Sequence, residues 1–125
     1  MAVVVKPDYT VALYAGDTEI VTIAMTHGDA GSNILLSEVS TAVFTLKDVQ
    51  AGSVVNSRNA QNVLNANNFT IANGSIEWKV QTADTNIVTS GAQREVHRGE
   101  FILTLTDSQR KMFVIDLVIR QQGIP

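Results

Sequence analysis

The sequence predicts an all-β protein: a single antiparallel β-sandwich of immunoglobulin-like, Greek-key architecture that spans residues 1–125. Val, Ile, Thr and Phe recur in short runs, turn-forming residues separate the runs, and no segment holds a long apolar period of 3.6 residues. About seven to nine short strands over roughly 120 residues are typical of a sandwich. A chain of this length fits one domain with one hydrophobic core.

The clearest strand signal lies at residues 75–81, where Ile76, Trp78 and Val80 alternate with polar residues. This alternation predicts Trp78 in the core rather than on the surface as a platform for a sugar ring. β-prone composition or alternation predicts further strands at residues 2–5, 9–14, 19–26, 40–47, 69–72, 101–106 and 110–120.

Three other segments lack that alternation. Residues 51–68, AGSVVNSRNAQNVLNANN, form an Asn-rich insertion that is long for a connection in a compact domain. Two alternatives stay open for it: a short helix capped by Ser57 and running to Leu64, or an irregular excursion. Residues 84–90 are expected to return the chain as part of a hairpin, and residues 92–99 to be polar.

The composition excludes several classes of protein. A net charge of −3 and a pI near 5.2 argue against a protein that binds nucleic acid through phosphate contacts. The absence of cysteine excludes disulfides, thiolate metal sites and cysteine nucleophiles. We expect no signal peptide in the N-terminal residues, and no apolar run approaches the roughly 20 residues of a membrane span. Charged residues make up only 17%, which leaves more neutral surface for subunit contacts.

No motif for catalysis or metal binding is present. The two histidines, His27 and His97, have no metal-ligand spacing. His27, beside Asp29, is expected in a solvated loop, and His97 in a polar strand or loop that faces water. There is no calcium-binding loop, phosphate-binding loop or nucleophile elbow. We therefore expect no enzymatic activity, no cofactor and no metal.

The last predicted strand, RKMFVIDLVIR, is apolar on both faces. One face supplies the core, and Met112, Val114 and Val118 lie on the other with Asp116 among them. A soluble monomer seldom leaves a large apolar patch in water, so something covers this second face. Either the insertion or the N-terminal run folds across it, or a neighbouring subunit does. The core face consists of Phe113, Ile115, Leu117 and Ile119.

A second candidate contact is the N-terminal run Val3, Val4 and Val5, which is short and β-prone. Such a strand can add to the open sheet edge of a neighbouring subunit through backbone hydrogen bonds. The alternative is an edge strand in the protein's own sandwich.

A diffuse family pattern runs along residues 16 to 119. Gly16-Asp17-Thr18 lies between two predicted strands, a leucine patch follows at residues 34–37, and the next strand ends at Lys47. The stretches 74–78 and 99–107 complete the order. This order resembles the small β-sandwich modules of tailed-bacteriophage virions, with the N-terminal domain of siphophage baseplate upper proteins as the nearest pattern. The insertion at 51–68 departs from it, and the leucine patch lacks the usual Asp-Leu-Thr-Gly wording.

The resemblance implies a role without catalysis: a non-enzymatic structural protein of the virion, assembled in the host cytoplasm. It would be a capsid cement or decoration protein, or a small tail or baseplate adaptor. Its partners would be other virion proteins, with a homo-oligomer expected, and neither nucleic acid nor membrane. The alternative from another class is a carbohydrate- or cell-surface-binding module, which requires exposed aromatic residues around Trp78, Tyr9 and Tyr14. A third is a hydrolase or metal enzyme built on His27 and Asp29.

Overall fold

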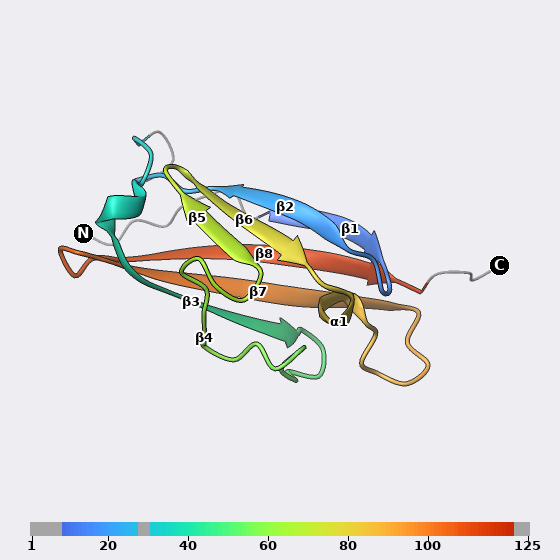
Figure 1. The fold of residues 1–125 in the computed structure, drawn as a ribbon. Coiled ribbons are helices and arrows are strands. Elements are labelled where there is room, and N and C mark those ends of the chain that lie inside the picture. Colours follow the sequence, from blue (N-terminus) through green and yellow to red (C-terminus); the bar gives the residue numbers. More distant parts are fainter. Residues whose placement is uncertain (1–8, 28–30, 122–125) are drawn as a thin grey trace.

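The computed structural model describes residues 9–27 and 31–121 and confirms the all-β sandwich. One sheet has the strand order β1-β8-β7-β3-β4, and the second has the order β2-β6-β5. The second sheet lies across the first as a separate layer (Figure 1). The strands are β1 (Tyr9–Tyr14), β2 (Glu19–Ala24), β3 (Val39–Asp48), β4 (Gln61–Asn62), β5 (Phe69–Ala72), β6 (Ser75–Val80), β7 (Arg94–Leu105) and β8 (Arg110–Arg120), with a 3₁₀ turn at Leu36–Glu38 and one helical turn, α1, at Thr82–Thr85.

The strand pairing contains one departure from the prediction. All pairs are antiparallel except β1, which runs parallel to β8 with Tyr9 opposite Ile115 and Tyr14 opposite Arg120. The cause is the turn after β1, which takes the chain into the other sheet, so that β1 cannot form a hairpin with β2 and pairs with the last strand instead. The immunoglobulin-like character of the sandwich stays a prediction.

The core lies between the two sheets and is built around four aromatic rings. Trp78 stacks on Phe69 with ring centroids 5.4 Å apart, and Phe44 lies 4.4 Å from Phe101. Trp78 is fully buried, as predicted. Gly99 makes room for this cluster, because a Cβ there would come within 2.5 Å of the Phe44 ring. The packed rings fix the distance between the sheets.

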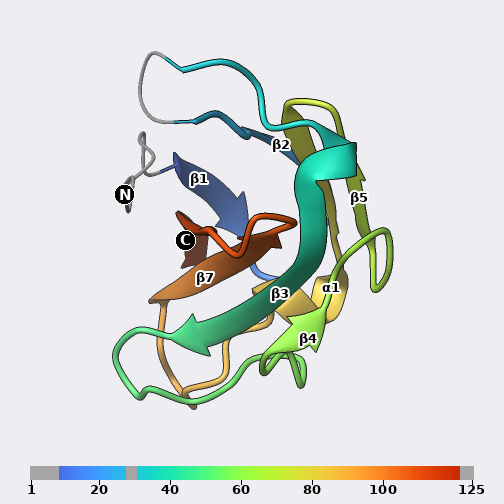
Figure 2. The same ribbon diagram turned by 90° about the vertical axis from the view of Figure 1, so that its left-hand side faces the viewer.

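Three segments settle or correct the predictions. The insertion at 51–68 takes the irregular alternative and forms no helix: it follows the edge of β3, contributes the short β4, and holds six non-glycine residues with positive φ, Ser57 among them (Figure 2). Residues 94–99, predicted to be polar and placed outside the strand at 101–106, are the first half of β7, a strand of 12 residues that begins at Arg94. The return predicted for residues 84–90 is instead α1 followed by a loop. Within the described residues, no helix is long and apolar enough to span a membrane.

Candidate protein interface

The outward face of the five-stranded sheet is the surface that carries the predicted contact residues Met112, Val114 and Val118. Side chains on this face alternate with core side chains along β1, β3, β7 and β8. We define the outward face as Thr10, Ala12 and Tyr14 on β1; Thr41, Val43, Thr45 and Lys47 on β3; Arg94, Val96, Arg98, Glu100, Ile102 and Thr104 on β7; and Arg110, Met112, Val114, Asp116, Val118 and Arg120 on β8.

Apolar side chains form two rows across the outward face. In one row Met112 lies opposite Ile102, which lies opposite Val43. In the other row Val118 lies between Val96 and Ala12. Cross-strand neighbours of this kind are close enough for their side chains to touch, so each row forms a continuous apolar strip. In the row of Met112, Ile102 and Val43, Met112 is the most exposed, with 47% of its surface accessible.

An ion pair separates the two apolar rows. Arg98 donates two hydrogen bonds to the Asp116 carboxylate, of 2.8 Å from Nε and 3.0 Å from Nη2. Arg98 is also the direct cross-strand neighbour of Asp116. Lys111 lies on the opposite face of β8 and is buried. The two parallel hydrogen bonds hold both side chains flat along the sheet.

The insertion does not cover the outward face. The strand order places β3 and β7 between it and β8. Its apolar residues Val55 and Val63 are buried in the core, and their amides donate to the Leu46 and Ala42 carbonyls of β3. The explanation that the insertion shields Met112 is therefore wrong. The N-terminal run with Val3, Val4 and Val5 lies outside the residues that the structure describes.

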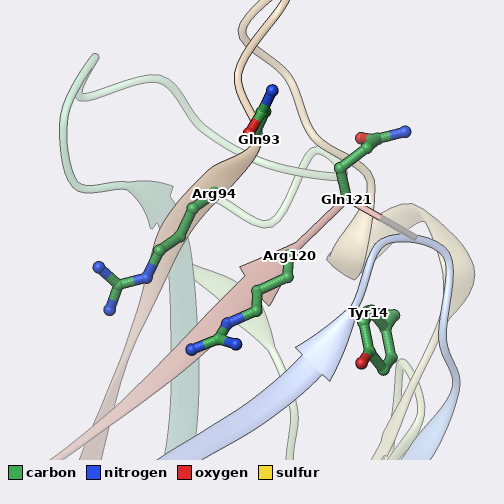
Figure 3. A pocket seen from close by; sticks show the side chains of 5 residues that line it. All are labelled: Tyr14, Gln93, Arg94, Arg120 and Gln121. Carbon is green, nitrogen blue, oxygen red and sulfur yellow. The ribbon is translucent and has the colours of Figure 1, made fainter. Parts of the chain in front are cut away.

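One end of the outward face is hollowed into an open pocket of about 540 Å³. Arg94 and Arg120 lie opposite each other on β7 and β8, and Tyr14 lies opposite Arg120 on β1. The two arginine side chains extend in the same direction, with Tyr14 beside Arg120 (Figure 3). Gln93 and Gln121 complete the lining.

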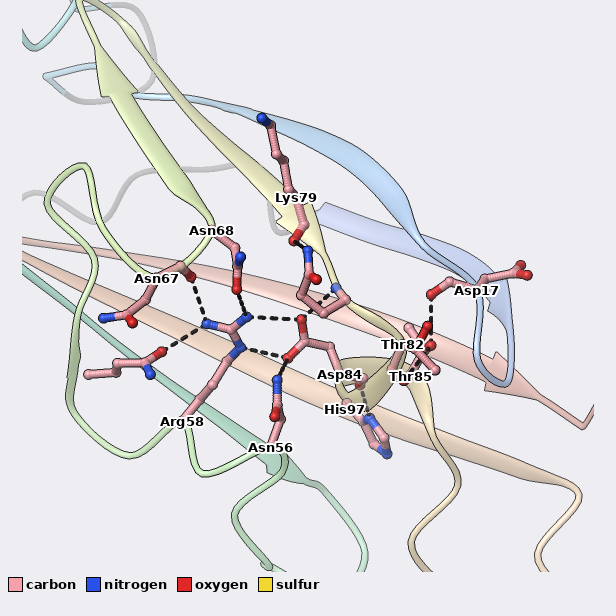
Figure 4. A network of polar contacts seen from close by, with 12 residues as sticks. Asp17, Asn56, Arg58, Asn67, Asn68, Lys79, Thr82, Asp84, Thr85 and His97 are labelled. Carbon is pink, nitrogen blue, oxygen red and sulfur yellow. Dashed lines mark hydrogen bonds and ion pairs between the residues drawn. The ribbon is translucent and has the colours of Figure 1, made fainter.

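A buried polar network ties the insertion to the core on the other side of the sheet (Figure 4). Arg58 is only 2% exposed, and all five of its N–H groups donate hydrogen bonds. Two of them reach the buried Asp84 carboxylate, at 2.6 and 3.1 Å, and its guanidinium lies 5.3 Å from the Phe69 ring centroid. The other acceptors are Gln61 Oε1, the Asn67 carbonyl and Asn68 Oδ1.

A second buried pair lies at the start of β7, where His97 and Glu95 are both on the inward face. His97 Nδ1 donates to the Asp84 carbonyl at 2.8 Å, and its Nε2 is 2.8 Å from Glu95 Oε1. The amides of Val88 and Thr89 also donate to the Glu95 carboxylate. Burial raises the pKa of Glu95, but these hydrogen bonds outweigh it and leave the pKa below the ordinary value. Both groups are therefore satisfied within the fold, and the expectation that His97 faces water is wrong.

His27 is half-buried rather than freely solvated. Its Nε2 lies 2.7 Å from Glu38 Oε2. Asp29, the proposed partner in a hydrolase or metal site, is outside the described residues. In the part of the chain that the structure describes, no three His, Asp or Glu side chains gather as metal ligands.

Comparison of the chain with protein-family models, with curated proteins and with solved structures gave no match.

Sequence reasoning missed the buried charges. Glu95 and His97 alternate with arginines along β7, so the pattern of REVHR resembles a solvated strand. Arg58 and Asp84 are 26 residues apart, and only tertiary structure brings them together. The sequence of β7 did contain a usable signal. Val96, Arg98, Glu100 and Ile102 follow one another at period two and therefore share one face of the strand. Glu95 and His97 lie on the other face, together with the core residue Phe101.

Proposed function

We propose that this protein is a non-enzymatic structural subunit that binds other protein subunits through the outward face of its five-stranded sheet. The resemblance in sequence makes a tailed-phage virion the setting, as a capsid cement or decoration protein or a small tail or baseplate adaptor. The observation that carries the proposal is the apolar content of this face, with Met112, Ile102 and Val43 in one row and Val118 and Val96 in the other.

A sheet face in water is normally polar at alternate positions, since only the other face packs on the core. Here the apolar strips are continuous across three strands and are separated by charged residues. Met and Arg, two residue types enriched in protein interfaces, are both present on this face. Burial of these side chains against a partner supplies about 25 cal/mol for each Å² of apolar surface.

The carbohydrate-binding alternative requires an exposed Trp78, and this side chain is not exposed. Trp78 is fully buried and packed against Phe69 and Phe44, so it cannot stack on a sugar. Tyr14 is the one exposed aromatic side chain among those whose burial the structure describes, which do not include Tyr9, and one ring does not make an aromatic platform.

The location in the virion is tested by immunogold electron microscopy of particles from the source lysate, with an antibody against this chain. Label over the heads identifies a cement or decoration protein, and label at the neck or one end of the tail identifies an adaptor. Particles that lack the protein by immunoblot and by label would contradict the virion proposal.

A further inference from the structure

Two positively charged side chains, Arg94 and Arg120, lie next to each other at the end of the outward face. Arg94 and Arg120 are direct cross-strand neighbours, and like charges in this position destabilise a sheet. No acidic residue of the described chain forms an ion pair with either side chain. Both are exposed. On the same face Arg98 has its carboxylate, Asp116, whereas Arg94 and Arg120 lie side by side without one.

The backbone under this pair is held in place. The Arg120 carbonyl accepts from the Ala15 amide at 2.8 Å, and the Gln121 amide donates to the Gln93 carbonyl at 2.8 Å. These bonds fix the register of β1, β8 and β7 where the pocket opens. The two guanidinium groups and the Tyr14 hydroxyl are thus presented from three paired strands.

We infer that the pocket of Tyr14, Arg94 and Arg120 is a binding site for a carboxylate group of a partner protein, an Asp or Glu side chain or a C-terminus. A carboxylate between two guanidinium groups removes their repulsion and accepts charge-assisted hydrogen bonds from both. The Tyr14 hydroxyl adds a neutral donor. This inference rests on the proposed function for its choice of a protein as ligand.

The rest of the face favours an acidic protein over the other sources of an anion. The outward face carries five basic and two acidic side chains, a formal charge of +3 in a chain of −3. A second copy docked through the same face would bring two such positive surfaces together, so this face suits a different, acidic surface. A nucleic-acid backbone would meet Asp116 and Glu100 and the apolar rows beside the arginines, where it gains no phosphate contacts.

The test is an NMR titration of the full chain with a blocked pentapeptide in which two glutamates alternate with valines. The matched peptide has glutamine at both positions, and inorganic phosphate and a short single-stranded oligonucleotide are the other probes. We expect the glutamate peptide alone to shift the backbone amide signals around Tyr14, Arg94 and Arg120. R94Q and R120Q should each weaken its binding about tenfold. The control R110Q changes an exposed arginine at the other end of the face and should leave binding unchanged.

Equal response to the glutamine peptide, equal loss in R110Q, or stronger binding of phosphate or the oligonucleotide would overturn the inference. Far-ultraviolet circular dichroism of the variants establishes that each is folded. If the peptide fails while a cross-linker on Val114 still captures a partner subunit, the carboxylate site is wrong and the interface stands. If the peptide binds but that cross-linker captures nothing in assembled particles, the proposed function fails instead.

Discussion

At the scale of single residues, Arg58 explains how a long polar insertion is held on a hydrophobic core. Its guanidinium is planar and has five donors in fixed directions, and each finds an acceptor. Its charge is matched by Asp84 and lies near the faces of Phe69 and Trp78. One side chain therefore joins the insertion, the turn α1 and the aromatic core.

We predict that Arg58→Met lowers the free energy of unfolding by about 3–5 kcal/mol, because Asp84 is left as an uncompensated buried charge. The double variant Arg58→Met/Asp84→Leu should recover most of this loss, since it removes both charges. Urea denaturation measures the free energy of unfolding of Arg58→Met, of the double variant and of a control. The matched control, Arg110→Met at an exposed position, should stay within about 0.5 kcal/mol of the original protein. A loss below about 1 kcal/mol in Arg58→Met would contradict the assigned role.

The Glu95 carboxylate gives stability a dependence on pH. Its pKa is lowered by folding, so its ionised form stabilises the native state above the unfolded pKa, and this contribution is lost as pH falls through the folded pKa. We expect Glu95→Gln to lower the free energy of unfolding by about 1–3 kcal/mol at neutral pH. The difference between the two proteins should shrink steadily below about pH 4.5.

Thermal unfolding of both proteins from about pH 7 to about pH 3 measures this difference. Glu100→Gln, an exposed change on the same strand, is the control and should change the free energy of unfolding at neutral pH by no more than about 0.5 kcal/mol. A difference for Glu95→Gln that is constant over this range would refute the assignment.

At the scale of the elements, alternation predicted best where a strand has one apolar face. Strand β1 has the predicted bounds, and β8 has the predicted length and inward face, with Phe113, Ile115 and Leu117 buried. The first half of β7 was missed because its inward face carries Glu95 and His97, whose burial depends on partners far away in sequence. The sequence did not decide between a helix and an irregular excursion for the insertion. Side-chain hydrogen bonds hold the insertion in place, and such bonds follow no sequence period.

The backbone of the insertion contains a residue with an unfavourable conformation. Ala60 has a φ of +48°, in the left-handed region that costs an L-residue about 1–2 kcal/mol. We predict that Ala60→Gly raises the free energy of unfolding by up to about 1 kcal/mol, since glycine removes the strain but adds entropy to the unfolded chain. Ala51→Gly, at an exposed position of the same segment without positive φ, is the control and should lower stability. A drop in both variants, measured by urea unfolding, would show that Ala60 is not strained.

At the scale of the whole molecule, the two sides of the five-stranded sheet carry different kinds of side chain. The inward side holds the aromatic core and the hydrogen-bonded Glu95 and His97, and the outward side holds apolar rows and the unpaired Arg94 and Arg120. Residues on the outward side are thus available for binding without serving the fold. The sequence predicted the exposed apolar positions of β8, but the charge of the whole face emerged only when the register brought four strands together.

This division predicts that changes on the outward face separate stability from binding. Met112→Glu should change the free energy of unfolding by no more than about 0.5 kcal/mol, because the side chain is half exposed. The same change should weaken incorporation into assembled particles, measured by quantitative immunoblot. Ala72→Glu, on the outward side of the other sheet and opposite the uncharged Ser75, should affect neither quantity. Equal incorporation of Met112→Glu and the original protein would argue against this face as the contact.

The most direct test of the central claim is photo-cross-linking in particles assembled in the source host, with benzoylphenylalanine at Val114 in the middle of the outward face. Mass spectrometry of the adduct identifies the captured chain and the captured residue. The proposal predicts a single adduct with another virion protein from Val114, and none from the matched position Thr70 on the other sheet. No adduct from Val114, or equal adducts from both positions, would contradict the claim that the outward face of the five-stranded sheet binds another subunit.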